Sequence, residues 1–139
     1  RIACPWLIRR FVDPRAELLF VSSSEVMGVA DRFDAIPFDV QDTLWSHRGE
    51  LCTCDTMLNE FALRAEPLDR VSKVVRATDT NMHDAVPEGA ELLALSVGLS
   101  CQYKDDHAQL EAGMALYDAL YRWARDGQTE GHDWPEVKA

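Results

Sequence analysis

Residues that could bind a metal ion or transfer protons occur in three groups along this chain. They are His47, Glu50, Cys52, Cys54 and Asp55, then Asp79 and His83, and finally Asp106, His107 and Glu111. His107 and Glu111 are four residues apart, so on a helix both side chains could reach one ion from the same side. Two protein ligands are too few, and we predict that His47 and Asp79 complete the site. Imidazole and carboxylate ligands suit zinc, iron or manganese.

Arginine side chains suggest a second kind of chemistry, the binding of oxyanions. A guanidinium group carries several N–H donors in one plane and forms charge-assisted hydrogen bonds with tetrahedral anions. The candidates are Arg9, Arg10, Arg48 and Arg76. The hypothesis takes Arg48 and Arg76 as the pair that holds a dianion in the same polar pocket.

Each of these groups also has an ordinary structural interpretation. His107 and Glu111 could decorate the first turn of a helix, where acidic groups interact favourably with the helix dipole. The arginines could be solvated or paired surface charges. Cys52 and Cys54 flank a predicted helix start and could be either packed thiols or thiols activated by the helix N-terminus. In an enzyme, Glu50 or Glu111 would handle protons beside a bound ion.

A long helix must position the residues of the third group. Apolar side chains recur at three- and four-residue steps at Leu110, Met114, Tyr117 and Tyr121. These residues share one face of a helix from about residue 105 to residue 123, and other apolar residues make a second face. A helix that is apolar on two sides belongs in the middle of a domain. Asp118 is expected to pair with Arg122 or Arg125 on the same helix.

The remaining elements are shorter. Helices are predicted from about residues 4–13, 24–33, 53–61, 67–79 and 88–99. Leu18–Val21 and Ile36–Val40 are predicted strands, the second at a sheet edge because Pro37 has no N–H to donate. The predicted fold class is α+β. It is a mostly helical single domain over residues 1–139, with a small two- or three-stranded sheet and a long central C-terminal helix.

The composition restricts the classes of function. The chain has 139 residues, of which 47% are hydrophobic, and a formal charge of −10. This charge, with scattered Lys and Arg, argues against nucleic-acid binding by this domain alone. No apolar run approaches the roughly 18 residues of a membrane span, so no membrane association is expected. Four cysteines without a Cys-x-x-Cys pair suggest a reducing compartment, and we expect the cytoplasm. The chain starts at Arg1 without a signal sequence, which suggests a processed or excised domain.

An ordered set of short motifs runs along the chain. The motifs are RIACPWLIRRF at 1–11, SHRGELC at 46–52, VRATDT at 75–80, LS at 99–100, DDH at 105–107, EAGM at 111–114, YDALY at 117–121 and HDWP at 132–135. In this order they resemble the C-terminal domain of the chromate-resistance protein ChrB family. The likeness extends over the whole chain.

The resemblance implies a bacterial protein of chromate-resistance operons, described as a chromate-responsive regulator, with a separate N-terminal region that contacts DNA. The expected function is then a metal- or oxyanion-binding sensor domain, in which the predicted pocket holds chromate or a similar dianion. One alternative is a small redox or hydrolytic metalloenzyme of the same resistance system. Another is a packing or dimerisation module without a ligand, for which the partner would be a second copy of the chain.

Overall fold

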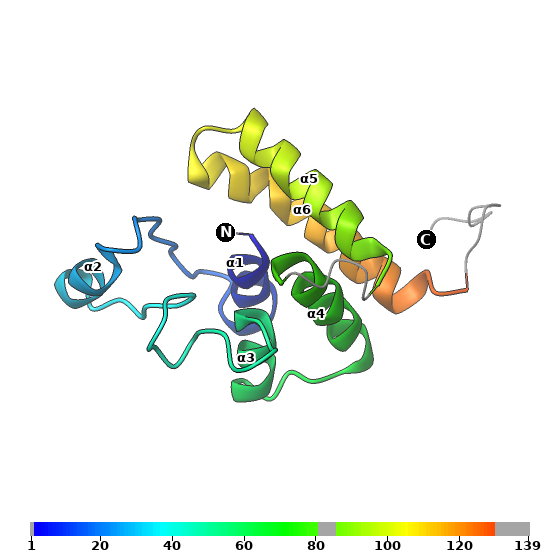
Figure 1. Ribbon diagram of the computed structural model, residues 1–139, viewed down its shortest axis with the longest axis horizontal. Coiled ribbons are helices and arrows are strands. Elements are labelled where there is room, and N and C mark those ends of the chain that lie inside the picture. The colour runs from blue at the N-terminus through cyan, green and yellow to red at the C-terminus, as the bar shows by residue number, and fades with distance from the viewer. Residues whose placement is uncertain (1, 81–85, 130–139) are drawn as a thin grey trace.

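The structure, a computed structural model, describes residues 2–80 and 86–129, and in these ranges every regular element is a helix (Figure 1). The elements are α1 (Ala3–Leu7), the π-helical turn η1 (Ile8–Val12), α2 (Val26–Phe33), α3 (Thr53–Glu60), α4 (Glu66–Asp79), α5 (Glu88–Gln102) and α6 (Asp106–Asp126). In Figure 1, α5 and α6 run side by side with α4 next to them, while α2 stands apart. None of the helices in these ranges combines the length and the apolar character that crossing a bilayer requires.

The long C-terminal helix is confirmed and packs against α1, α4 and α5. It begins where the carboxylate of Asp105 accepts a hydrogen bond from the backbone N–H of Ala108, which satisfies a donor that the first turn leaves free. Its buried residues include Leu110, Met114 and Tyr117, as the three- and four-residue spacing predicts. The apolar pattern therefore identified both the helix and the face that it buries.

Gly113 allows the start of the chain to approach α6 closely. A Cβ atom at this position would lie 2.7 Å from two carbon atoms of the Ile2 side chain. Ile2 is itself buried, so it has little room to move away. The glycine is thus required by packing between the N-terminal segment and α6.

Asp55 is a fully buried carboxylate that joins α3 to α4. It accepts hydrogen bonds from the backbone N–H of Cys52 at 3.2 Å and from the hydroxyl of Ser72. It also forms ion pairs with Arg64 at 3.2 Å and with Arg76 at 3.3 Å. Burial by itself would raise the pKa of Asp55, but these hydrogen bonds and the nearby guanidinium charge lower it overall. A buried charge requires such partners, so the network stabilises the position of α3 on α4.

The predicted sheet is wrong. Leu18–Val21 and Ile36–Val40 form no strands, and across the described ranges the only sheet-like pairing is an isolated bridge between Arg48 and Leu51. Leu18 is buried in the core while Leu19 is half exposed, so the apolar run packs against the helices without pairing with another strand. An extended backbone has a period of two whether or not another strand pairs with it. Asp39 has a φ of +58°, which is not an extended conformation, so the strand predicted at Ile36–Val40 is also wrong in its backbone conformation.

Asp118 is paired, but with different partners from those predicted. Nε and Nη2 of Arg10 each donate to a carboxylate oxygen of Asp118 at 2.9 Å, and the indole N–H of Trp6 donates at 2.8 Å. The hydrogen bond from Arg10 is the main reason that the pKa of Asp118 is lowered. Arg122 and Arg125 pair with Asp126 instead. The result is a link between the N-terminal turn and the middle of α6.

Candidate anion-binding site

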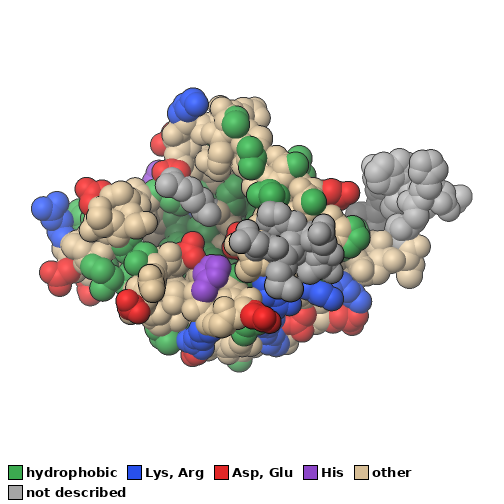
Figure 2. Space-filling model, viewed as in Figure 1, with side chains coloured by type: hydrophobic (Ala, Val, Ile, Leu, Met, Phe, Trp, Pro, Cys, Tyr) green, Lys and Arg blue, Asp and Glu red, His purple; other side chains and the backbone are tan. Residues whose placement is uncertain are grey.

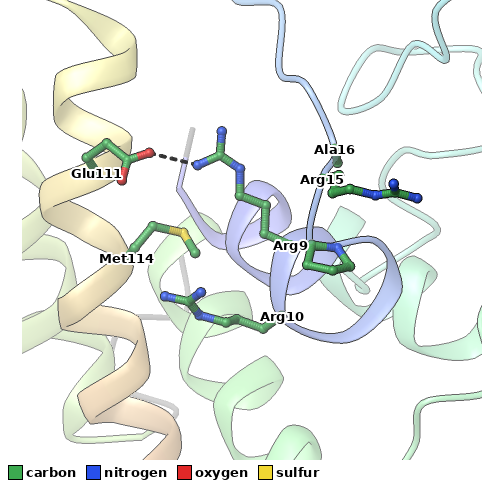
Figure 3. Close-up of a pocket in the computed structure, with 7 residues that line it drawn as sticks. Arg9, Arg10, Arg15, Ala16, Glu111 and Met114 are labelled. Atoms are coloured by element: carbon green, nitrogen blue, oxygen red, sulfur yellow. Dashed lines mark hydrogen bonds and ion pairs between the residues drawn. The ribbon is translucent and has the colours of Figure 1, made fainter.

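The N-terminal turn and α6 border a pocket of about 320 Å³ that contains three arginines (Figure 3). Its lining residues, called here the arginine pocket, are Arg9, Arg10, Pro14, Arg15, Ala16, Glu111 and Met114. Arg9 and Arg10 extend toward α6, whereas the guanidinium group of Arg15 points away from that helix. Glu111 is the single acidic residue in this lining. Asp118 lies outside this lining but pairs with Arg10, so the three arginines face two carboxylates and still leave the pocket attractive to an anion.

Both guanidinium groups that face α6 are held by carboxylates and still have N–H groups to offer. Nη1 of Arg9 donates to Oε1 of Glu111 at 2.8 Å, and Arg10 uses two donors on Asp118. A guanidinium group has five N–H donors, so each arginine keeps some for a ligand. The Glu111 side chain is 70% exposed, and an ion pair at such a position contributes only about 0–1 kcal/mol. An incoming anion could therefore replace this carboxylate.

The local sequence explains how the third arginine reaches the pocket. In η1 the backbone N–H of Asp13 donates to the carbonyl of Ile8 at 2.8 Å, five residues earlier, which is the π-helical pattern. The helix ends at Asp13 because the residue before a proline disfavours the helical conformation. The carboxylate of Asp13 then accepts the backbone N–H of Arg15 at 3.0 Å. This turn brings Arg15 to the other side of the pocket from α6.

The two arginines predicted to bind an anion lie outside the arginine pocket. Nη1 of Arg48 donates to Glu60 at 2.7 Å, and Nη1 of Arg76 donates to the buried Asp55 at 3.3 Å. Both acidic partners belong to α3. The assignment of Arg48 and Arg76 to an anion stays a prediction, and each of them has a carboxylate partner in the structure.

Two of the predicted metal ligands, His47 and Asp79, lie in one neighbourhood. Nε2 of His47 is 3.7 Å from a carboxylate oxygen of Asp39, and the charges of both residues act on Asp79. Desolvation raises the pKa of Asp79 and the charge of Asp39 raises it further, whereas the charge of the chain's N-terminus and that of His47 lower it. Asp79 is exposed and is one of the residues that line a second cavity. His83 lies outside the described residues.

The other two predicted metal ligands have different partners. The His107 ring contacts the ring of Phe20 edge-on, with centroids 5.1 Å apart, and Glu111 pairs with Arg9. Glu50, the alternative proton carrier, is exposed in the loop before α3. Within residues 2–80 and 86–129, no three or more His, Cys, Asp and Glu side chains are grouped so that they could hold a metal ion. Metal binding and turnover stay predictions.

The thiols at the start of α3 are packed and not activated. Cys52 is the N-cap residue of α3, and burial raises its pKa to about 12. Burial likewise raises the pKa of Cys4 and that of Cys54. Since the thiolate is the reactive form of cysteine, these three side chains behave as small apolar groups at neutral pH.

The arginine pocket could be only partly anticipated. Arg9 and Arg10 were candidates from residue type alone, and Arg15 follows the Asp13-Pro14 turn that directs it back. The contact with Glu111 spans 102 residues of sequence. No local pattern predicts which acidic residue of a helix will meet an arginine so far away, because the packing of η1 on α6 decides it.

This combination describes a helical domain whose N-terminal arginines meet carboxylates of its C-terminal helix. Residues 1–124 match the family described as ChrB, C-terminal domain. The chain is 30% identical over 122 residues to Protein ChrB of Cupriavidus metallidurans, a match that covers 87% of this chain. The chain therefore belongs to the ChrB C-terminal domain family, and the relationship to chromate-resistance proteins predicted from its motifs is confirmed.

The relationship concerns a part of that relative. The match covers 36% of the length of Protein ChrB, so the chain spans about a third of it. No protein of known structure matches this chain.

Proposed function

We propose that this domain binds a tetrahedral oxyanion in the arginine pocket and serves as the sensing part of a ChrB protein, with chromate as the physiological ligand. The observation that supports this is the gathering of three arginines around one pocket in a chain whose formal charge is −10. The choice of chromate rests on the family's relation to chromate resistance. In a full-length ChrB protein, contact with DNA would be made by a region outside this chain.

The chemistry of binding follows from the guanidinium groups. A dianion that leaves water must recover strong hydrogen bonds, and Arg9 and Arg10 supply charge-assisted donors from adjacent positions of one turn. Their planar arrangement of N–H groups suits two oxygens of the same anion. Arg15 adds positive potential from the other side of the pocket. The site selects charge and shape and needs no thiol and no metal ion.

Glu111 offers a route from binding to a signal. Without a ligand, its carboxylate pairs with Arg9 and connects η1 to α6. A bound dianion competes for the same guanidinium group, so the η1–α6 connection would then run through the ligand. Binding can shift the domain between these two arrangements only to the extent that their affinities for the anion differ. The residues just before and after η1 are therefore expected to report binding.

Isothermal titration calorimetry with sulfate and molybdate, followed by chromate, tests the proposal. The first two anions are tetrahedral dianions that do not oxidise thiols, so they report binding alone. Arg9→Gln removes the charge that faces Glu111 and should lower the anion affinity about tenfold, which corresponds to a loss of about 1.4 kcal/mol of binding free energy. Arg122→Gln is the matched control, because Arg122 is an exposed arginine of α6 that pairs with Asp126. It should bind all three anions as the wild type does.

Two results would reject the proposal. One is the same anion affinity for the wild type and Arg9→Gln, and the other is no detectable binding of any of the three anions to the folded wild type. Elemental analysis of the same preparations, with His107→Ala as the comparison, tests the predicted metal separately. A stoichiometric ion that the variant loses would support the metal-dependent alternative.

A further inference from the structure

A second cavity, of about 840 Å³, lies between the segment of residues 12–40 and helices α1, α4, α5 and α6. Much of its wall is apolar, with Leu18, Phe20, Val29, Phe38 and Leu93 among the lining residues. In Figure 2, hydrophobic side chains gather in the hollow beside α2. Pockets that bind small organic molecules have mostly apolar walls and volumes of about 300–1,000 Å³, and this cavity is typical of them.

The charges of this cavity all have the same sign. The charged residues that line it are Asp13, Glu17, Asp34, Asp39 and Asp79, and among the described residues no Lys, Arg or His belongs to the lining. We call it the acidic cavity. Among the described residues, His47 brings a basic group close to Asp39, and the charge of the chain's N-terminus also acts on Asp79. An anion that entered would meet unfavourable potential, whereas a cation would be attracted.

Asp79, which is exposed, adds a helix contribution to this negative potential. It is the last residue of α4, where the helix dipole adds negative potential. Tyr117 of α6 and Cys4 of α1 line the cavity as well, and the negative charge of Asp79 acts on both. Desolvation and the charge of Asp39 raise the pKa of Asp79, while the charge of the chain's N-terminus and that of His47 partly offset them.

From this geometry we propose that the acidic cavity binds an organic cation, a protonated amine with an apolar body, whose ammonium group lies against Asp79 and whose body packs on the apolar wall. Charge complementarity selects the cationic head, and the volume and the apolar wall select the body. The proposal is independent of the arginine pocket, because the two sites share only Ala16 in their linings and have opposite charge.

Three probes with one apolar body and different heads test this proposal. They are 4-phenylbutylamine, 4-phenylbutanol and 4-phenylbutyrate, and their binding is measured by isothermal titration calorimetry at pH 7. The amine should bind at least about tenfold more tightly than the alcohol, and the carboxylate more weakly than either. In Asp79→Asn the advantage of the amine over the alcohol should largely disappear, while the affinity for the alcohol stays within about twofold of the wild type.

Two further variants keep the test decisive. Asp126→Asn, which removes an exposed carboxylate of α6 outside the cavity lining, should leave the amine affinity unchanged. Ala30→Trp fills the cavity from α2 and should lower the affinities for the amine and for the alcohol together. This variant provides the test if circular dichroism shows that Asp79→Asn does not fold. Equal affinities of the wild type for the three probes would overturn the proposal. It would also be overturned if Asp79→Asn still bound the amine more tightly than the alcohol and Ala30→Trp still bound both. Sulfate binding in these variants reports the arginine pocket separately.

Discussion

The arginine pocket and the acidic cavity lie on the same short segment and have opposite chemistry. Ala16 lines both, and the residues next to it divide between them, with Pro14 and Arg15 on one side and Glu17 on the other. The lining of the arginine pocket includes three arginines and one carboxylate, whereas the charged side chains described in the lining of the acidic cavity are all carboxylates. A formal charge of −10 therefore says little about either site, because each potential is determined by the few side chains that packing brings together.

The two regions also differ in how their charges are balanced. Arg9 and Arg10 meet carboxylates of α6 at hydrogen-bond distance, so the arginine pocket is already neutralised in part. Asp79 has no such partner among the described residues and its pKa is raised. A ligand of the arginine pocket must therefore compete with protein carboxylates, whereas a cation in the acidic cavity would add to the partial compensation that the chain's N-terminus and His47 give to Asp79.

The largest expected effect tests whether both regions depend on one frame. Asp55→Asn removes the charge that Arg64 and Arg76 share and should lower the free energy of unfolding by about 3 kcal/mol. This value is at the lower end for a broken buried ion pair, because both arginines are about a third exposed. Urea unfolding followed by circular dichroism measures it. Affinities for sulfate and for 4-phenylbutylamine should both fall if α3 and α4 position the two regions together. Loss of one affinity alone would show separate frames.

Acid should reproduce part of this loss in the wild type. The folded-state pKa of Asp55 is below its ordinary value of about 3.9, so its contribution to stability is present above that pH and is lost as the pH falls through the folded-state pKa. The stability difference between the wild type and Asp55→Asn should therefore shrink below about pH 4. Asp118 and Asp126 also have lowered pKa values, but both proteins share them, so the difference isolates Asp55. A difference that is constant from pH 7 to pH 2.5 would contradict this account.

A substitution at Gly113 should distinguish the two regions. Gly113→Ala places a methyl group against Ile2, which lines the acidic cavity but not the arginine pocket. Overpacking of this kind costs about 1–3 kcal/mol, which thermal unfolding would reveal. The amine affinity should fall because Ile2 must shift, while the sulfate affinity should change little. Unchanged stability would mean that Ile2 moves freely, contrary to its burial.

The smallest effect is a gain. Glu111→Gln keeps the shape of the side chain and removes the negative charge that competes for Arg9, so sulfate should bind about threefold more tightly, in keeping with an exposed ion pair. The amine affinity should not change. Glu91→Gln, an exposed residue of α5 that lines neither region, is the control for the loss of one negative charge. Weaker sulfate binding in Glu111→Gln would show that Glu111 supports the anion instead of competing with it.

Local pattern in the sequence determined the helices, because spacing, caps and prolines act within a few residues. The positions of α6, α4 and α5 follow from apolar steps, from Asp105 as a cap and from Pro67 near the start of α4, and the ordered motifs identified the family. The tertiary structure alone decided that Leu18–Val21 has no partner strand, that Asp118 pairs with Arg10 instead of Arg122, and that Glu111 pairs with Arg9. Each of these outcomes joins or separates residues far apart in the chain, and a local pattern contains no information on which distant surfaces will pack together.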